Sequence, residues 1–468
     1  MVFTTHIFVF YFLPLFLLVY FNLPYRWRNF FITCMSYIFY GWWKPWFVIL
    51  MFISTVMDFT WARIIARPGA APRSRKLALA ACCVMNLGFL GFFKYYMFSV
   101  ESLNALLGLV GEPAFRILRV SLPIGISFYT FHSLSYVIDV YRGRVKPAKK
   151  FFDYACFVAL FPDLVAGPII RYRTLAEQIT YREHTVPRFA SGVNIFILGF
   201  AKKILLANTM GNVADAVFNA AAPGMAAAWL GVLAYAFQIY FDFCGYSDMA
   251  TGLGRMIGFE IMKNFDAPYR SESITDFWRR WHISLSSVLR DYLYFPLGGN
   301  RKGESRTYIN LAIVMLLGGL WHGAKWQFVV WGGYHGLLLA FERWRGKKSA
   351  YGTLPRTMRI GITFLLVLFS WVLFRADNLM AAARYFAAMF GILPSDGAAP
   401  LLLAEICRPH LLGVMALCAF VVFQRVQAFD WSVKPQTWVR VALLVPAFLL
   451  SLIIMFSQAF NPFLYFQF

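Results

Sequence analysis

The sequence predicts an all-α, polytopic membrane protein, and two observations lead to this class. Of its 468 residues, 60% are hydrophobic and only 14% are charged, which is too apolar a balance for a soluble globular protein. The apolar runs continue over helix-spanning lengths of about 20 residues and do not alternate as membrane β-strands do. We therefore expect about eleven to twelve transmembrane helices.

The net charge is +22, from 44 Lys and Arg residues against 22 Asp and Glu residues. In a soluble protein this excess would suggest a nucleic-acid partner. Here the basic residues lie in short connections between apolar runs, where cytoplasmic retention of Lys and Arg explains them. We expect membrane lipids with anionic headgroups to be partners of this charge, and no nucleic acid.

The expected spans follow one another along the whole chain without an internal repeat or a long linker, so we predict a single domain, residues 1–468. The spans are residues 6–23, 30–42, 46–64, 77–98, 121–140, 151–170, 189–207, 226–245, 307–341, 359–374, 410–426 and 439–460. The first run lacks a basic stretch and a cleavage site, and is interpreted as a retained span. Basic connections at residues 66–76 and 142–150 are expected in the cytoplasm, which places the N-terminus outside.

Residues 151–170 contain the sequence FPDLVAGPI, in which Pro162 and Pro168 flank Gly167. Proline breaks the helix, and a break at membrane depth is tolerated only where neighbouring protein satisfies the freed backbone groups. We therefore expect this segment to be buried inside the helix bundle.

Residues 242–341 concentrate polar chemistry in an otherwise apolar chain and are the predicted active-site core. Three of the seven histidines lie here, namely His282, His322 and His335. Imidazole transfers protons near neutral pH, so a histidine at membrane depth is a functional candidate. The histidines interpreted as structural are His6, His132, His184 and His410.

His282 follows a helix start signal in a stretch, residues 245–306, that has no clean span and is expected to form interfacial or re-entrant helices. Ser273 and Asp276 make a capping-box pattern, after which apolar residues recur at helical spacing. His282 shares that apolar face and is a candidate site residue. The alternative is a histidine that donates to a buried backbone carbonyl.

His322 lies inside an apolar, glycine-rich run, residues 307–341, which would exceed the thickness of the hydrocarbon as one straight helix. The glycines predict a break in the helix or a close helix contact, and Gly319 and Gly323 are expected to border a pore beside the imidazole. The alternative for His322 is a packing role, which is the favoured interpretation for His335.

Carboxylates near the apolar shell are expected to pair with arginines or, less commonly, to orient a histidine. They are Asp242, Asp248, Asp266 and Asp291. The sequence has no nucleophile elbow, Walker motif, zinc-protease motif or dinucleotide fingerprint, and no cysteine spacing that suits a metal. Neither a metal nor a bound cofactor is expected.

Three long motifs resemble those of the membrane-bound O-acyltransferase family, in its bacterial exopolysaccharide branch. They read DFCGYSDMATGLGRMIGF, NFDAPYRSESITDFWRRWHISLSSVLRDYLYFPLGGNR and GGLWHGAKWQFVVWGGYHG, and the resemblance extends from the N-terminal MVFTTHIFVFYFLPLF to the closing PFLYFQF. It implies a helical fold around a central pore, with His322 and His282 as catalytic residues. The residues expected to bind substrate are Trp321, Asn264, Asp266, Trp278, Arg279 and Tyr246.

The resemblance also implies the reaction. It predicts that an acetyl group passes from a cytoplasmic donor, expected to be acetyl-CoA, across the bacterial inner membrane for periplasmic O-acetylation of alginate or cellulose. The implied partners are periplasmic SGNH-type acetyltransferases and other polysaccharide-biosynthesis subunits. The competing class is a non-enzymatic transporter or channel subunit, which the multi-span architecture favours but which lacks a detectable inverted repeat.

Overall fold

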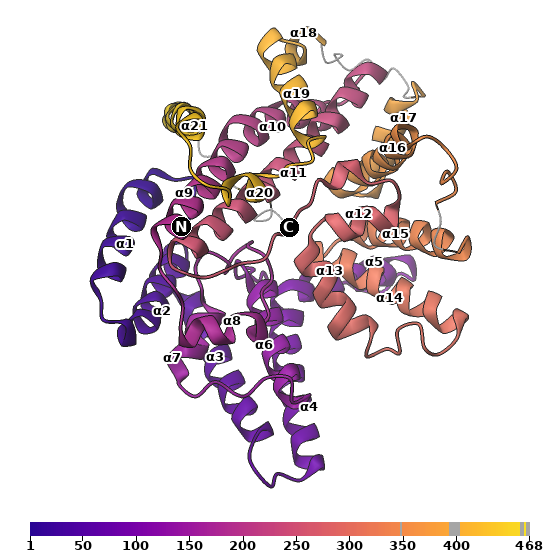
Figure 1. Cartoon of the computed structure of the whole chain (residues 1–468). Coiled ribbons are helices and arrows are strands. Elements are labelled where there is room, and N and C mark those ends of the chain that lie inside the picture. The colour runs from indigo at the N-terminus through magenta and orange to yellow at the C-terminus, as the bar shows by residue number, and fades with distance from the viewer. Residues whose placement is uncertain (347–348, 393–402, 459–462, 465–468) are drawn as a thin grey trace. The chain divides into compact units, whose positions relative to one another are not determined.

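The computed structural model describes residues 1–346, 349–392, 403–458 and 463–464, and every regular element among them is helical (Figure 1). These residues form two compact units, Met1–Gly192 with Leu253–Met262, and Val193–Gly252 with Lys263–Phe468. Helices α9 (Val186–Ala201) and α11 (Met225–Met256) each begin in one unit and end in the other. Because continuous helices link the units, two units do not by themselves make two domains, and the single domain stays a prediction.

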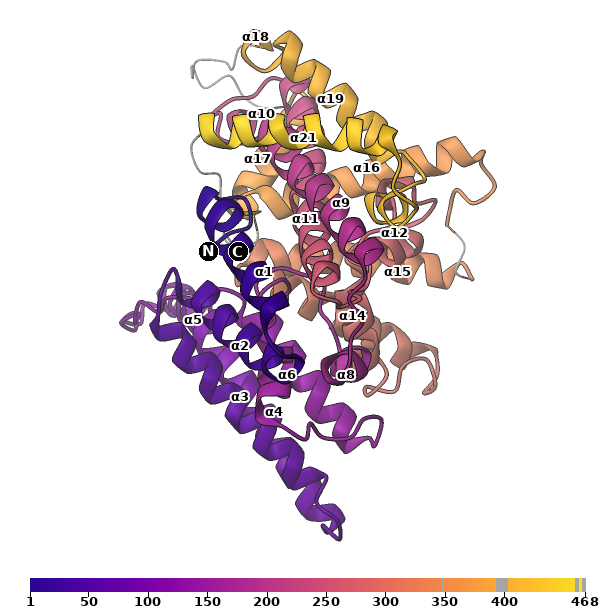
Figure 2. The same ribbon diagram turned by 60° about the vertical axis from the view of Figure 1, so that its left-hand side comes forward.

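The first unit contains the N-terminal helices. In chain order they are α1 (Leu13–Asn22), α2 (Tyr25–Gly41), α3 (Trp46–Ile65), α4 (Pro72–Leu90), α5 (Tyr96–Leu109), α6 (Ile126–Tyr141), α7 (Phe151–Val158) and α8 (Tyr172–Thr180). The π-helical turns η1 (Phe8–Phe12) and η2 (Gly91–Tyr95) continue into α1 and join α4 to α5. Figure 2 shows α3 and α4 running side by side, and α3, α4 and α6 pack on one another.

The FPDLVAGPI segment is buried as predicted. Residues 154–170 are all buried, although the helix ends at Val158 and the chain then turns without regular structure. Backbone groups in this stretch find partners in neighbouring helices, since Phe161 N–H donates to Ser36 Oγ over 3.1 Å and Ile170 N–H donates to His132 Nε2 over 3.3 Å. Such bonds give backbone N–H groups hydrogen-bond partners within the protein, as irregular backbone at membrane depth requires.

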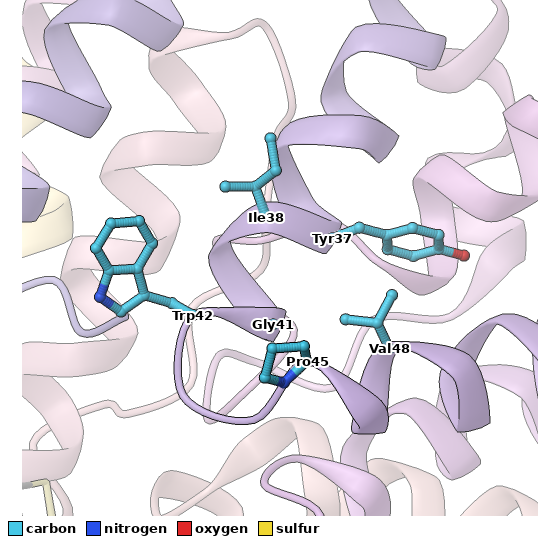
Figure 3. A pocket seen from close by; sticks show the side chains of 6 residues that line it. All are labelled: Tyr37, Ile38, Gly41, Trp42, Pro45 and Val48. Atoms are coloured by element: carbon cyan, nitrogen blue, oxygen red, sulfur yellow. The ribbon is translucent and has the colours of Figure 1, made fainter.

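A surface groove of about 640 Å³ lies at the turn between α2 and α3 (Figure 3). It is lined by Tyr37, Ile38, Gly41, Trp42, Pro45 and Val48. A Cβ atom at Gly41 would lie 2.9 Å from Val48 Cγ2, so a glycine lets the two helix ends approach closely. The lining is apolar apart from one phenol and offers no acid–base group.

The second unit contains the remaining helices. After α9 they are α10 (Asn208–Phe218), α11, α12 (Ile274–Arg280), α13 (Ile283–Leu289), α14 (Glu304–His322), α15 (Trp326–Trp344), α16 (Arg356–Arg375), α17 (Leu379–Met389), α18 (Leu403–Ile406), α19 (Pro409–Val422), α20 (Ala428–Ser432) and α21 (Trp438–Ser457). Shorter turns are η3 (Lys202–Ala207), η4 (Pro268–Arg270) and η5 (Arg290–Tyr294).

Helix α11 is the most deeply buried of the six long apolar helices, because 83% of its most apolar 18-residue stretch is buried inside the protein. Gly199 of α9 and Gly245 of α11 face each other, and a Cβ atom at Gly245 would lie 2.7 Å from Gly199 O. Two ion pairs, Lys202–Asp248 at 2.6 Å and Lys203–Asp242 at 2.5 Å, join η3 to α11. The helix that carries the first motif is therefore held from within the unit.

Among the described residues, six helices are long and apolar enough to cross a membrane, fewer than the expected eleven to twelve. They are Trp46–Ile65, Pro72–Leu109, Val186–Phe218, Met225–Met256, Arg356–Arg375 and Trp438–Ser457, with shorter apolar helices at Phe8–Asn22, Leu379–Met389 and Pro409–Val422. The multi-pass helical class is confirmed. The higher number counted buried segments such as residues 154–170, which are apolar because protein covers them.

Candidate active site

Helices α14 and α15 form an antiparallel hairpin that places His322 at its bend. The predicted break is present, because α14 ends at His322 and α15 begins at Trp326. Gly319 and Gly332 meet across the hairpin, where an added Cβ on Gly319 would overlap Phe328 O and one on Gly332 would overlap Met315 O. Both views show α14 and α15 lying together (Figures 1 and 2).

The glycines expected to border a pore therefore have a different role. Gly319 holds the hairpin closed, and Gly323 is covered by the ring of Phe328. The small size of Gly319 allows the two backbones to approach, and that of Gly323 leaves room for the Phe328 ring. The sequence could not separate these uses from space for a ligand. Gly318, one residue earlier, is the glycine that lines a cavity.

That cavity measures about 200 Å³ and reaches His322. Its lining is mostly aliphatic and aromatic, and comprises Trp278, Leu285, Ser286, Leu289, Arg290, Tyr294, Leu311, Val314, Met315, Gly318, His322, Trp331 and Leu339. His322 is 4% exposed, and its ring lies 5.1 Å from Trp331 and 5.4 Å from Phe374 between centroids. One imidazole thus borders a small chamber whose mostly apolar lining with a few polar groups is typical of small-molecule sites.

His282 lies at a break between two short helices, so the helical spacing that placed it on one apolar face does not continue through it. The predicted N-cap is confirmed, because Ser273 Oγ accepts the N–H of Asp276 at the start of α12, while the Asp276 carboxylate accepts the N–H of Glu272 and not that of Ser273. The helix ends at Arg280, and His282 adopts left-handed backbone angles with φ of +47° before α13 begins. This backbone conformation is strained for a residue other than glycine, and strained residues of this kind are common at functional sites.

The strained turn is held by residues 264–266. Ile283 N–H donates to Asn264 O over 2.9 Å, and Asp266 N–H donates to Arg280 O over 3.0 Å. The buried carboxylate of Glu342 also accepts the N–H groups of Ile274 and Thr275, over 2.8 and 2.9 Å, at the start of α12. The bonds to Glu342 fix the start of α12 on α15, and the other two join the turn at His282 to residues 264–266.

The hydrogen bonds of Asn264 determine which nitrogen of His282 carries the proton. Ser284 N–H and Ser284 Oγ–H donate to Asn264 Oδ1 over 3.1 and 2.9 Å, so that atom is the amide oxygen. His282 Nδ1 lies 3.3 Å from the same oxygen and can only be its donor. In the neutral imidazole, Nε2 then keeps its lone pair.

Burial keeps His282 neutral. The residue is fully buried, and desolvation lowers its pKa from 6.5 to about 3. The edge-on ring of Phe243 covers one side of the imidazole, with centroids 4.7 Å apart at an interplanar angle of 88°. His282 lies outside the six candidate spans.

The two predicted catalytic histidines lie together. Their ring centroids are 6.3 Å apart, and Trp321 contacts both, at 5.9 Å from His282 and 5.0 Å from His322. Residues 40 positions apart in the sequence thus form one cluster with a neutral imidazole at its centre. Of these two histidines, His322 is the one that lines the cavity.

The residues expected to bind substrate are divided by the structure. Asn264 and Trp321 contact the histidines, and Trp278 lines the cavity. Tyr246 is buried one helical turn from Phe243, against Phe463. Two others lie elsewhere, since Asp266 pairs with Lys263 at 2.9 Å and Arg279 is exposed.

The remaining carboxylates of the core form ion pairs, as expected, but mainly with lysines. Asp242 pairs with Lys203 and Asp248 with Lys202, while Asp291 is bonded to the adjacent Arg290 at 2.8 Å. His335 has the expected packing environment, because its ring stacks on Phe277 and its Nδ1 accepts from Trp278 Nε1 over 3.3 Å.

Sequence reasoning missed three residues that shape the site: Phe243, Ser284 and Phe374. The position of Ser284, two residues after His282, could have indicated a role. In the structure it donates to the same amide oxygen as His282. Phe243 and Phe374 carried none, because a phenylalanine in an apolar run is typical of any buried helix.

Comparison with known proteins identifies this arrangement. The family model of the membrane-bound O-acyltransferase family matches residues 147–380, which include both histidines and the cavity. The chain belongs to the membrane-bound O-acyltransferase family. It is therefore an acyltransferase enzyme.

Relatives within the family are similar over most of their length. The probable alginate O-acetylase AlgI of Azotobacter vinelandii is 44% identical, with all of both chains aligned. The protein of the same name in Pseudomonas aeruginosa is 47% identical over 88% of this chain and 78% of its own. A peptidoglycan O-acetyltransferase of Helicobacter pylori is 36% identical over 84% and 80%.

Proposed function

We propose that this protein transfers acetyl groups from a cytoplasmic thioester, acetyl-CoA, to a hydroxyl outside the bacterial inner membrane, for O-acetylation of an exopolysaccharide. The observation that carries the proposal is the pairing of His322 and His282, 6.3 Å apart, beside a cavity of about 200 Å³. Relatives named probable alginate O-acetylase support alginate ahead of cellulose.

The reaction requires a base and no nucleophilic residue. His322 takes the proton of the acceptor hydroxyl while the oxygen attacks the thioester carbonyl carbon. The tetrahedral intermediate then expels the thiolate of CoA, which receives the proton from His322 as the carbon–sulfur bond breaks. The products are the acetyl ester and free CoA, and the histidine ends as it began.

His282 positions a reactant. Its Nδ1–H donates to Asn264 Oδ1, so the remaining ring nitrogen of the neutral imidazole, Nε2, is an acceptor. His282 in this state accepts a hydrogen bond and does not donate one to an oxyanion. An amide N–H of the pantetheine arm of the donor is a donor group of the right kind. Holding the thioester in this way reduces the entropic part of the barrier.

The size of the cavity supports a relay to a periplasmic partner. A chamber of about 200 Å³ admits an acetyl group and the end of a pantetheine arm, but no oligosaccharide. The acceptor hydroxyl is therefore presented singly at its edge, as a serine of an SGNH-type partner would present it.

The orientation has its own test. With the N-terminus periplasmic, cysteines introduced at Arg73 and Arg144 are expected in the cytoplasm. In intact cells they should resist an impermeant thiol reagent and react after permeabilisation. Ready labelling of both in intact cells would reverse the proposed orientation.

Purified protein reconstituted in liposomes, given acetyl-CoA labelled in the acetyl group and a hydroxyl acceptor, tests the enzymatic step. Wild-type protein should release CoA in proportion to acetyl ester formed, and His322→Ala protein should release none above background. A transporter subunit would instead move label between compartments without forming ester or free CoA, and that result would overturn the proposal.

A further inference from the structure

Phe463 and Leu464 are buried in the second unit, although they follow its last helix. Phe463 is 1% exposed and Leu464 is 7% exposed. Leu464 N–H donates to Asp242 Oδ2 over 2.8 Å, and the other oxygen of that carboxylate pairs with Lys203 at 2.5 Å. One buried carboxylate of α11 thus binds both a lysine of η3 and the backbone of this late segment.

The ring of Phe463 continues towards the site. It lies 4.7 Å from the ring of Tyr246 and 6.2 Å from that of Phe243, both on α11. Phe243 in turn places its edge against His282, 4.7 Å away. A row of three rings, Phe463, Phe243 and His282, therefore leads from the anchored segment to the cluster.

The hydrogen-bond contacts described for the His282 ring lie at Nδ1, which is 3.3 Å from Asn264 Oδ1 and 3.4 Å from Ser284 Oγ. Because these contacts are at one edge of the ring, the packed aromatic rings, Phe243 among them, oppose a tilt that would move Nε2. Phe243 opposes the tilt only if it cannot move itself, and Phe463 packs against it. Catalytic geometry is sensitive at this scale, because a displacement of about 1 Å can cost roughly 100-fold in rate.

We propose that Phe463 and Asp242 are positioning residues for acyl transfer. Asp242 anchors the backbone at Leu464, the anchor holds Phe463 against Phe243, and Phe243 fixes the direction in which His282 presents Nε2. The inference rests on the proposed function, and it assigns a reaction role to Phe463, which is not among the residues that line the cavity.

The first test compares two buried phenylalanines of the same unit. Phe463→Ala should lower kcat roughly 10- to 100-fold and leave KM for acetyl-CoA within about twofold, because orientation is lost and binding is not. Phe463→Leu should restore most of kcat by refilling the space. The control is Phe200→Ala, a fully buried ring that packs on Phe196 at 6.0 Å and should lower thermal stability with little change in kcat.

The pH profile separates positioning from general loosening. A tilted His282 that meets water should regain a pKa nearer 6.5, so Phe463→Ala protein should lose activity between pH 7 and 5.5 more steeply than wild type. The groups that contact this imidazole include Asn264, Ser284, Trp321, Phe243 and His322. Phe200→Ala leaves all of them in place and should keep the wild-type profile.

The second test isolates the hydrogen bond to Leu464 without an unpaired buried charge. The double variant Lys203→Met with Asp242→Asn keeps an acceptor for the Leu464 N–H, and kcat should stay within about threefold of wild type. The double variant Lys203→Met with Asp242→Leu removes that acceptor and should match the loss in Phe463→Ala protein.

The outcomes are distinguishable. If wild-type protein forms no ester, the proposed function fails. If wild type is active while Phe463→Ala and Phe200→Ala proteins show equal kcat and equal pH profiles, the positioning inference is overturned and the function stands. Equal activity of the two double variants would likewise overturn the role of Asp242.

Discussion

His282 donates its Nδ1 proton to Asn264 Oδ1, 3.3 Å away, and thereby presents Nε2 as an acceptor. The direction of this bond follows from the two donors of Ser284 that share the amide oxygen. An amide and not a carboxylate thus orients the buried imidazole. A neutral orienting group suits a histidine that must stay uncharged, since a carboxylate would stabilise the imidazolium.

Replacing this amide by a carboxylate should make the enzyme sensitive to acid. In Asn264→Asp protein the anion beside His282 should raise the imidazole pKa from about 3 towards neutrality, so that kcat falls below about pH 7 and approaches the wild-type value above it. Activity measured from pH 5.5 to 8.5 tests this. A parallel pair of profiles would refute the proposed hydrogen-bond direction.

His322→Ala should reduce acyl transfer by about 100- to 10,000-fold, the usual contribution of a positioned general base. The variant should still be monodisperse in detergent, because His322 borders a cavity and its loss enlarges that space. His335→Gln is the matched control: this buried histidine packs on Phe277 and Trp278 and should retain activity per folded molecule. Similar losses in both variants would show that His322 only packs.

Two adjacent glycines should behave differently. Gly318→Leu should fill the cavity and abolish transfer while the melting temperature stays near wild type, because a Cβ there meets only Leu289 Cδ1 at 3.4 Å. Gly319→Leu should instead destabilise the protein by about 1–3 kcal/mol or more, since it forces α14 and α15 apart. Thermal unfolding and activity, measured on both variants, separate the effects, and a stable but inactive Gly319→Leu protein would contradict the packing role.

Glu342 should affect the site through helix α12. Its carboxylate accepts two backbone N–H groups and the hydroxyl of Thr275, the last over 2.6 Å. Glu342→Leu leaves those buried donors without acceptors and should cost about 2–5 kcal/mol, whereas Glu342→Gln keeps one acceptor and should cost less. Chemical or thermal unfolding in a mild detergent gives the order of the two variants, and equal stability would reject the capping role.

His184 should make stability depend on pH. Partial burial and the nearby Arg28 and Arg182 lower its pKa from 6.5 to about 4, and its Nε2 bonds Tyr20 Oη at 2.8 Å. The unfolded chain therefore binds more protons between these values, so the contribution is complete above pH 6.5 and is lost as the pH falls towards 4. The melting temperature of His184→Gln protein should fall less than that of wild type between pH 7.5 and 5. The exposed His410→Gln variant should follow wild type.

Much of the fold class and part of the site were predictable from the sequence. The excess of apolar runs determines a helical membrane protein, because hydrocarbon allows only backbone that satisfies its own hydrogen bonds. Pro162, Gly167 and Pro168 determine a break that had to be buried, and the glycines after His322 determine a bend. Proline and glycine act on the backbone at and next to their own positions, so their effects can be predicted from the sequence.

Only the tertiary structure decided the surroundings of the two histidines. The left-handed backbone at His282 depends on bonds to Asn264, 18 positions earlier, and no periodicity records such a pairing. Gly318 and Gly319 are equivalent in the sequence, yet one faces a cavity and the other a backbone, because a rotation of about 100° per helical residue separates their directions. Phe463 reaches Phe243 across 220 residues through a hydrogen bond to one buried carboxylate. Contacts between distant segments depend on complementary shape and on charge pairing in the folded state. The residue types therefore indicate the chemistry, but only the fold shows where each residue lies.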